Sequence, residues 1–218
     1  MSVIPRSLAC GLILSLALTA LAETSSWAEG ISVITVAPRV GEGGDSPVLS
    51  RAPTWGGGMT LISVGPRVGV SGQSPFGKNQ KYDFQQYDAA AVFRLPWGWL
   101  HRSGDWGLET RLLASAGQLS AAGETSLMAT LVPGLAVSSR NGRVSIDAGA
   151  GAGYFSNYKF GVQDFGGPVQ IIGTAGIGFN LFTGFHAGYR FQHFSDAGIY
   201  GPGTIGVDMH IIDLSYRF

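Results

Sequence analysis

The sequence predicts an all-β fold: an eight-stranded antiparallel transmembrane β-barrel, formed after a signal peptide is cleaved. Three observations lead to this expectation. The amino-terminus carries an apolar run typical of an export signal, the rest of the chain has few charged residues and many glycines, and eight segments alternate between apolar and polar residues. Such alternation gives each strand one face for lipid and one face for the barrel interior.

The amino-terminus is organised like a secretory signal peptide. Arg6 precedes an apolar run over residues 8–21, and Ala20-Leu21-Ala22 supplies small residues at the cleavage positions. We therefore expect a signal peptide over residues 1–22, with residue 28 as an alternative end after Ser26-Trp27-Ala28. The apolar run is also shorter than the roughly 20 residues of a membrane-spanning helix.

Composition narrows the class of protein further. The 14 basic and 14 acidic side chains cancel, which argues against a nucleic-acid partner. Charged residues make up 13% of the chain, well below the usual ~25%. Cys10, the only cysteine, lies in the signal peptide, so the exported chain has no disulfide and no thiolate metal site. An exported chain without an apolar stretch of roughly 18 residues can still span a bilayer as a closed barrel.

Residues 23–54 are rich in Gly, Pro and Ser, and we expect them to be irregular. Within them, residues 31–48 (ISVITVAPRVGEGGDSPV) resemble residues 59–76 (MTLISVGPRVGVSGQSPF), which indicates a partial duplicate of the first strand. We expect the second copy to occupy the barrel, because a hairpin partner follows it. The barrel is then expected over residues 55–218.

Eight segments of about ten residues match the length of a tilted membrane strand. They are Met59–Val70, Phe84–Arg94, Trp106–Leu119, Leu127–Ser138, Val144–Tyr154, Val169–Asn180, Phe185–Ser195 and Asp208–Phe218. An eight-stranded barrel is filled by its own side chains, so we expect no pore. Between the fourth and fifth segments, Asn141-Gly142 predicts a type I′ hairpin turn.

The inward faces of these segments carry charges of both signs, and we expect them to form ion pairs inside the barrel. They are Asp88, Arg94, Glu109, Arg111, Asp147, Arg190, Asp213 and Arg217. A soluble β-sandwich or lipocalin would show a similar alternation. The export signal, the apolar outer face and the terminal Tyr-Arg-Phe favour the membrane.

Three polar residues near the carboxy-terminus are candidates for catalysis. His193 and Ser195 are two residues apart on one strand, so they share the outward face, and Asp208 has the outward parity of its own strand. Polar groups on a lipid-facing surface are costly, which favours a functional reading. Ser195 would be the nucleophile, His193 the base and Asp208 the acid that orients it, with oxyanion donors from the backbone near Ala197 and Gly198. A His-x-Ser pair is also short enough to arise by chance.

The other candidate motifs are weaker evidence for a functional site. His210 shares the face of Asp208 and could be a substitute base, a headgroup contact or an interfacial polar residue. The four histidines show no metal-ligand spacing, and the alternating run Ala148–Gly153 lacks the strand–loop–helix context of a dinucleotide site. We expect neither a metal nor a cofactor.

The carboxy-terminal residues carry a family resemblance. The run His193–Ile199, followed by Pro202, Gly206, Asp208 and the terminal Ser-Tyr-Arg-Phe, resembles the PagL family of outer-membrane lipid A 3-O-deacylases. The resemblance implies an eight-stranded barrel in which His193 is the base and Ser195 the nucleophile. Asp208 stands where the family places a Glu at a spacing shifted by one residue. Asp196 and Gly203 stand where the family has Asn.

The resemblance implies an outer-membrane esterase that removes the ester-linked 3-position acyl chain from lipid A of lipopolysaccharide. The site would lie near the outer leaflet of a Gram-negative outer membrane, because the loop between the last two strands is extracellular if the carboxy-terminus is periplasmic. The alternative is a non-catalytic small barrel, adhesin-like or structural, and a third reading is a soluble periplasmic binder. The expected partners are lipid A and the outer membrane, with a homodimer left open.

Overall fold

The fold was analysed in a computed structural model. It describes residues 54–55, 58–72, 80–96, 101–103, 105–182, 184–201 and 204–218. The predicted signal peptide, residues 1–22, and the first copy of the duplicated motif, residues 31–48, lie outside these described residues. Among the described residues, no helix is long and apolar enough to cross a membrane.

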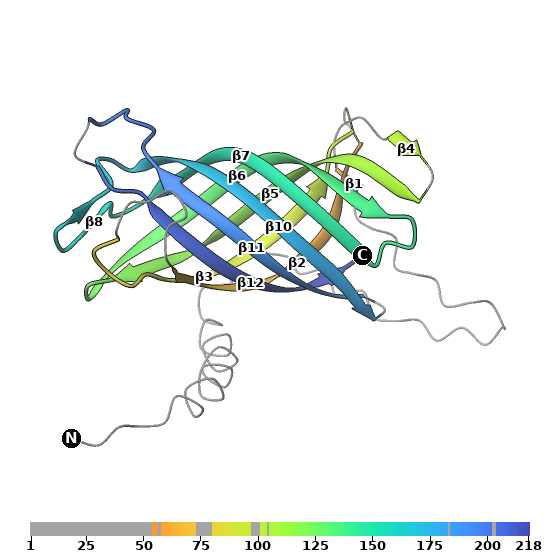
Figure 1. Ribbon diagram of the computed structural model, residues 1–218, viewed down its shortest axis with the longest axis horizontal. Coiled ribbons are helices and arrows are strands. Elements are labelled where there is room, and N and C mark those ends of the chain that lie inside the picture. The colour runs from red at the N-terminus through yellow and green to blue at the C-terminus, as the bar shows by residue number, and fades with distance from the viewer. Residues whose placement is uncertain are drawn as a thin grey trace, which may run out of the picture. The chain divides into compact units, whose positions relative to one another are not determined.

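Eight long strands form the wall of the molecule (Figure 1). They are β2 (Met59–Ser71), β3 (Gln85–Arg94), β5 (Trp106–Ala121), β6 (Glu124–Ser139), β7 (Val144–Phe155), β10 (Val169–Phe182), β11 (Phe185–Ser195) and β12 (Val207–Arg217). Each corresponds to one predicted segment. Four short strands accompany them: β1 (Thr54–Trp55), β4 (His101–Ser103), β8 (Lys159–Phe160) and β9 (Gln163–Asp164).

The long strands close into an antiparallel barrel. Each pairs with its neighbours along the chain, and β2 pairs with both β3 and β12, so the first and last long strands complete the ring. The register of the closing pair sets Val68 opposite Ile212. The second copy of the duplicated motif therefore supplies the first barrel strand, as predicted. Closure satisfies the backbone groups that an open sheet edge would leave unpaired.

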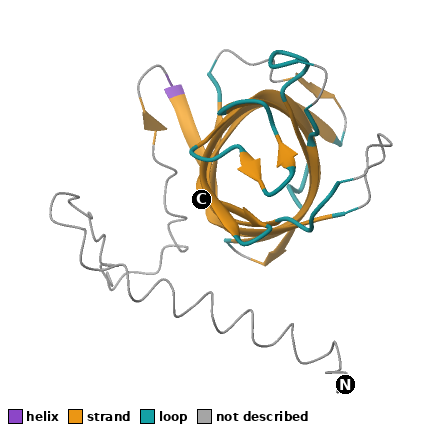
Figure 2. Ribbon diagram, turned by 90° about the vertical axis from the view of Figure 1, so that its left-hand side faces the viewer, coloured by secondary structure: helices purple, strands orange, loops and turns teal. Residues whose placement is uncertain are grey.

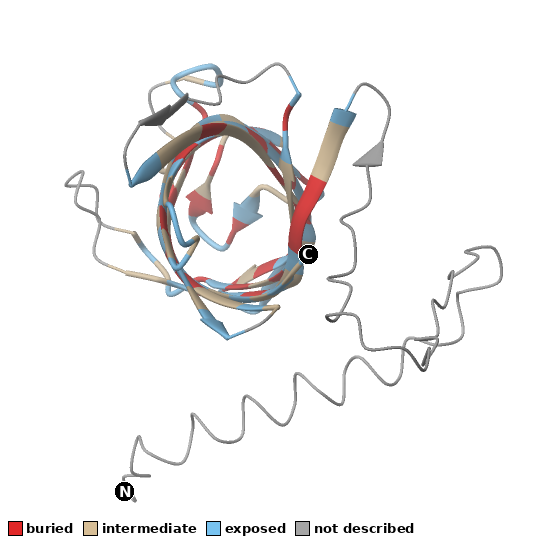
Figure 3. Ribbon diagram, turned by 90° about the vertical axis from the view of Figure 1, so that its right-hand side faces the viewer, coloured by how far each residue is buried: buried red, intermediate tan, exposed pale blue. Residues whose placement is uncertain are grey.

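Residues of different burial follow one another along the strands of the ring (Figure 3). The exposed positions are largely apolar, whereas the buried ones include both polar side chains and an apolar cluster. Large apolar residues such as Leu131, Ile146 and Ile212 are more than half exposed on the outer wall. Inside, ion pairs join oppositely charged side chains at short distances. They are Arg67–Asp88 at 2.7 Å, Arg94–Glu109 at 2.7 Å, Arg111–Glu109 at 2.5 Å and Arg190–Asp147 at 2.7 Å. Internal pairing is confirmed for six of the eight predicted charges, namely Asp88, Arg94, Glu109, Arg111, Asp147 and Arg190, and Arg67 is an interior charge that was not predicted.

One end of the barrel is filled by aromatic side chains. The hairpin formed by β8 and β9 lies within the outline of the ring when the barrel is viewed from this end (Figure 2). Phe160 and Phe165 from this segment are fully buried against Phe84 of the loop before β3. Full burial of one such side chain contributes about 1.5–3 kcal/mol. The barrel is therefore plugged at this end.

The predicted hairpin between β6 and β7 is confirmed, but its predicted turn type is wrong. Gly142 has a φ of 66°, whereas Asn141 is not among the residues with positive φ, and a type I′ turn needs positive φ at both central positions. The turn with that signature lies between β5 and β6, where Ala122 and Gly123 have φ of 52° and 79°. Four residues separate β6 from β7, so Asn141-Gly142 is not a two-residue loop.

Candidate active site

The candidate site lies on the outer wall, where β11 and β12 approach the plugged end. The even-numbered residues at the end of β11, including Gln192 and Phe194, are fully buried inside the barrel. His193 and Ser195 alternate with them and point outward, as the parity predicts. Phe194 packs edge-on against Phe155 with ring centroids 5.3 Å apart, which anchors the strand from within.

His193 and Asp208 form a cross-strand pair. They are directly opposed in the register of β11 and β12, and His193 Nδ1 lies 2.5 Å from Asp208 Oδ1. The Asp208 side chain is 1% exposed and that of His193 is 30% exposed, so the acid lies beneath the imidazole. A carboxylate on Nδ1 fixes the ring and leaves Nε2 to accept a proton. The predicted acid therefore pairs with the predicted base, but it is covered by protein where a lipid-facing position was expected.

Gly206, just before β12, brings His193 and Ser195 to a common point. A Cβ built on Gly206 would lie 3.2 Å from His193 Cε1 and 3.3 Å from Ser195 Cβ. It would also collide with the backbone oxygen of Phe194. The backbone of Gly206 thus packs against both side chains, and the predicted base and nucleophile gather around one small residue.

Asp196 organises the loop that follows Ser195. Its carboxylate accepts hydrogen bonds from Gly198 N at 3.1 Å, Tyr200 N at 3.1 Å and Thr204 Oγ1 at 2.8 Å. Burial raises the pKa of Asp196, but these hydrogen bonds outweigh it and hold the pKa below its usual value. This role of Asp196 was not predicted from the sequence. Its position directly before Ala-Gly, typical of an Asx turn, is the signal that was present.

The same contacts correct one expectation about the oxyanion site. Gly198 N was expected to stabilise an oxyanion, but it already donates to Asp196. Ala197, the other expected position, has a φ of 51°, which sets the tight turn after Ser195. The Ala197 N–H stays a predicted donor.

His210 has a partner of its own on the outer wall. Its Nδ1 lies 2.6 Å from the hydroxyl oxygen of Tyr189, and its ring packs edge-on against Phe191. His210 is one outward position along β12 from Asp208. The His193–Asp208 pair is separate from it, which disfavours His210 as a substitute base.

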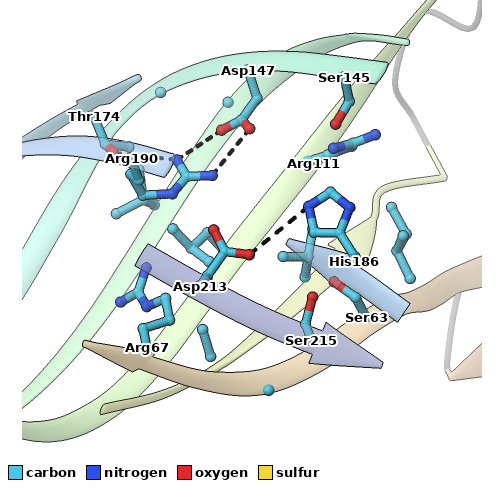
Figure 4. A pocket seen from close by; sticks show the side chains of 18 of the residues that line it. Ser63, Arg67, Arg111, Ser145, Asp147, Thr174, His186, Arg190, Asp213 and Ser215 are labelled. Atoms are coloured by element: carbon cyan, nitrogen blue, oxygen red, sulfur yellow. Dashed lines mark hydrogen bonds and ion pairs between the residues drawn. The ribbon is translucent and has the colours of Figure 1, made fainter. Parts of the chain in front are cut away.

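A cavity of about 60 Å³ lined by charged and apolar side chains lies elsewhere, inside the barrel (Figure 4). It is lined by the Arg190–Asp147 pair and by His186, whose Nε2 is 3.9 Å from Asp213 Oδ1. Neither His193 nor Ser195 lines it. The cavity belongs to the ion-paired interior, whereas the candidate site faces outward. In the part of the chain that the structure describes, no group of three or more His, Cys, Asp or Glu side chains is placed so that it could bind a metal ion.

Fold and site together define a class of protein: outer-membrane β-barrels that carry a histidine–acid pair and a serine on the lipid-facing wall. The chain belongs to the PagL family, because the family model described as "Lipid A 3-O-deacylase (PagL)" matches residues 85–217. That stretch contains all three predicted site residues.

Two individual proteins are similar to this chain. The lipid A deacylase PagL of Bordetella bronchiseptica (strain ATCC BAA-588 / NCTC 13252 / RB50) is 37% identical over 76 residues, which cover 35% of this chain and 42% of the relative. The match therefore spans less than half of that protein. The crystal structure of the outer membrane enzyme PagL superposes with a TM-score of 0.58 at 21% identity, covering 72% of this chain and 99% of that one. This second similarity concerns the fold alone.

Proposed function

We propose that this protein is an outer-membrane esterase that removes the ester-linked 3-position acyl chain from lipid A. One observation carries the proposal: the His193–Asp208 pair, 2.5 Å apart, lies beside Ser195 on the outward face of β11 and β12. Membership of the PagL family supports the choice of substrate. A buried charge is costly unless it serves a partner, and the partner of Asp208 is the imidazole of His193, which is partly exposed on the outer wall.

The chemistry follows from the roles of the three side chains. Ser195 Oγ attacks the ester carbonyl carbon while His193 Nε2 takes its proton, and Asp208 stabilises the imidazolium. Collapse of the tetrahedral intermediate breaks the bond to the sugar oxygen, which receives the proton from His193. A water then attacks the acyl-serine with His193 again as base, and the free fatty acid leaves.

The outward position of the site suits a lipid substrate. An acyl chain in the outer leaflet lies alongside the barrel wall, so its ester reaches His193 and Ser195 laterally without entering the barrel. Phe84, Phe160 and Phe165 belong to the apolar cluster that fills one end of the barrel, which favours the lateral approach. A homodimer, which the sequence left open, is not tested by this structure of a single chain.

Incubating the purified, folded barrel with lipid A in detergent tests this proposal. The expected products are one free fatty acid per lipid A and a lipid A lacking the 3-position ester chain, identified by fragmentation in mass spectrometry. Release of a chain from another position would contradict the substrate assignment. Absence of release by a heat-modifiable, folded barrel would contradict the esterase assignment.

A further inference from the structure

A buried glutamine in the plug connects the hairpin to the candidate site. Gln163, the first residue of β9, is 0% exposed. Its Oε1 accepts a hydrogen bond from Lys81 N at 3.1 Å, and its Nε2 donates to Gly206 O at 3.3 Å. Glutamine suits this position because its amide offers an acceptor and a donor at once.

The Gly206 end of this bridge reaches the nucleophile and the base. The backbone of Gly206 packs against His193 Cε1 and Ser195 Cβ, as the positions around its missing Cβ show. The neighbouring residue is held by the same hairpin, because Ile205 N donates to Asp164 O at 3.3 Å. The hairpin therefore determines where the backbone before β12 lies.

The Lys81 end of the bridge reaches the acid. Lys81 follows Gln80, whose Nε2 donates to Gly72 O at 2.8 Å and to Asp208 O at 3.4 Å. Gln163 thus joins the chain segment beside Asp208 to the segment beside Ser195. These segments belong to two different loops of the barrel.

The hairpin is rigid enough to act as a fixed support. Phe160 and Phe165 flank Gln163 in sequence, and their rings lie 5.4 Å apart at full burial. Phe165 also contacts Phe155, which packs against Phe194 between His193 and Ser195. These ring contacts hold the hairpin in the end of the barrel, and the Gln163 amide is its polar link to Gly206.

We propose that Gln163 is a positioning residue that holds Gly206, and through it His193 and Ser195, in the geometry for ester cleavage. This inference rests on the proposed function. Misplacing a catalytic group by about 1 Å costs on the order of 100-fold in rate. Removing the Gln163 amide is therefore expected to lower kcat by about 10- to 100-fold and to leave KM within about twofold, because Gln163 is buried away from the substrate.

The test compares Gln163→Met with Gln170→Met. Both residues are buried glutamines whose Nε2 donates to backbone oxygens, but the bonds of Gln170 go to Phe165 and Gly167. Gln170→Met thus measures the general effect of losing such an amide near the plug. Expected results are a fall in kcat for Gln163→Met alone, with similar losses of thermal stability for both variants.

A second readout separates this inference from the choice of substrate. A fluorophosphonate probe labels an activated serine without lipid A, so its rate on Ser195 reports the geometry of His193 and Ser195 directly. We expect Gln163→Met to slow labelling by about the same factor as kcat, and Ser195→Ala to abolish it. Should Gln163→Met not fold, Gln163→Asn replaces it, since its neutral amide is one methylene shorter and cannot span Lys81 N and Gly206 O together.

Two results would overturn the inference. One is a Gln163 variant whose kcat and Ser195 labelling rate equal those of wild type. The other is an equal fall in kcat for the Gln163 and Gln170 variants. Failure of wild-type barrel to cleave lipid A while Ser195 is still labelled would refute the proposed substrate and leave the labelling comparison to decide the role of Gln163.

Discussion

His193 Nδ1 and Asp208 Oδ1 lie 2.5 Å apart across β11 and β12, at directly opposed positions of the two strands. The register that produces this pair follows from burial, because a slip of one residue would turn the exposed apolar side chains Ile212, Leu214 and Tyr216 into the barrel. Asp208 is therefore held under the imidazole by the same pattern that makes the outer wall apolar. The acid–base pair is a consequence of how the barrel closes.

Replacing the acid tests this pair. Asp208→Asn keeps the shape of the side chain but removes the charge that stabilises the imidazolium. We expect kcat to fall by roughly 10²–10⁴-fold, as loss of an orienting carboxylate does in Ser/His/Asp enzymes. Steady-state deacylation by heat-modifiable, folded protein measures this fall in kcat. A kcat within twofold of wild type would show that another acid orients His193.

Adding one methyl group at Gly206 is expected to disturb the site. In Gly206→Ala the new Cβ meets the Phe194 oxygen, His193 Cε1 and Ser195 Cβ, so the backbone or the two side chains must shift. We expect the labelling rate of Ser195 to drop about tenfold or more. Gly173→Ala is the matched control, since Gly173 is opposite His193 on β10 and an added Cβ there has no neighbour within 4 Å. Equal labelling of both variants would refute the crowding argument.

The Asp196 contacts predict how the loop after Ser195 responds to acid. The pKa of Asp196 is lower in the folded protein than in the unfolded chain, so its contribution is present above the ordinary Asp value of about 3.9. That contribution is lost as the pH falls through the lowered folded pKa. We expect cleavage by pepsin within residues 196–201 to increase as the pH drops below about 4. Asp196→Ala, which lacks the carboxylate, is expected to be cleaved rapidly already at a pH of about 4. A loop equally resistant in both proteins would contradict this role.

The interior ion pair between Arg67 and Asp88 is expected to contribute to the free energy of unfolding and not to catalysis. Arg67 and Asp88 form a two-point ion pair, with side chains 2% and 0% exposed. Asp88→Ala leaves a buried guanidinium without its partner, so we expect the free energy of unfolding to fall by about 3–5 kcal/mol. Replacing both, as Arg67→Met with Asp88→Leu, is expected to cost less. Urea unfolding in lipid vesicles measures the free energy of unfolding of the single and the double variant. An equal decrease in the two would mean that lost packing, and not the unpaired charge, is responsible.

Much of the fold could be predicted from the sequence, because lipid and barrel interior impose a strict two-residue period. The eight long strands were located by that period, and the pairing of Asp147 with Arg190 follows from placing charges inside. The turn at Asn141-Gly142 was misassigned because the loop there has four residues. At the Ala122-Gly123 turn, alanine adopts a positive φ that its residue type does not favour.

The candidate site was predictable where it depends on strand parity and not where it depends on loops. His193, Ser195 and Asp208 were placed by their positions on β11 and β12. Gln163 gave no such signal, because its role arises from the insertion of the β8–β9 hairpin into the barrel end. The expectation that Gly198 is an oxyanion donor was wrong because of another loop contact: the Gly198 N–H donates to Asp196.

The most direct test of the account is the mass of lipid A from a lipopolysaccharide-bearing host that expresses the wild-type chain or Ser195→Ala. We expect wild type to remove one ester-linked 3-position acyl chain from lipid A, and Ser195→Ala, folded to the same extent, to leave lipid A intact. Unchanged lipid A in cells that contain the folded wild-type barrel, or the same loss with Ser195→Ala, would contradict it.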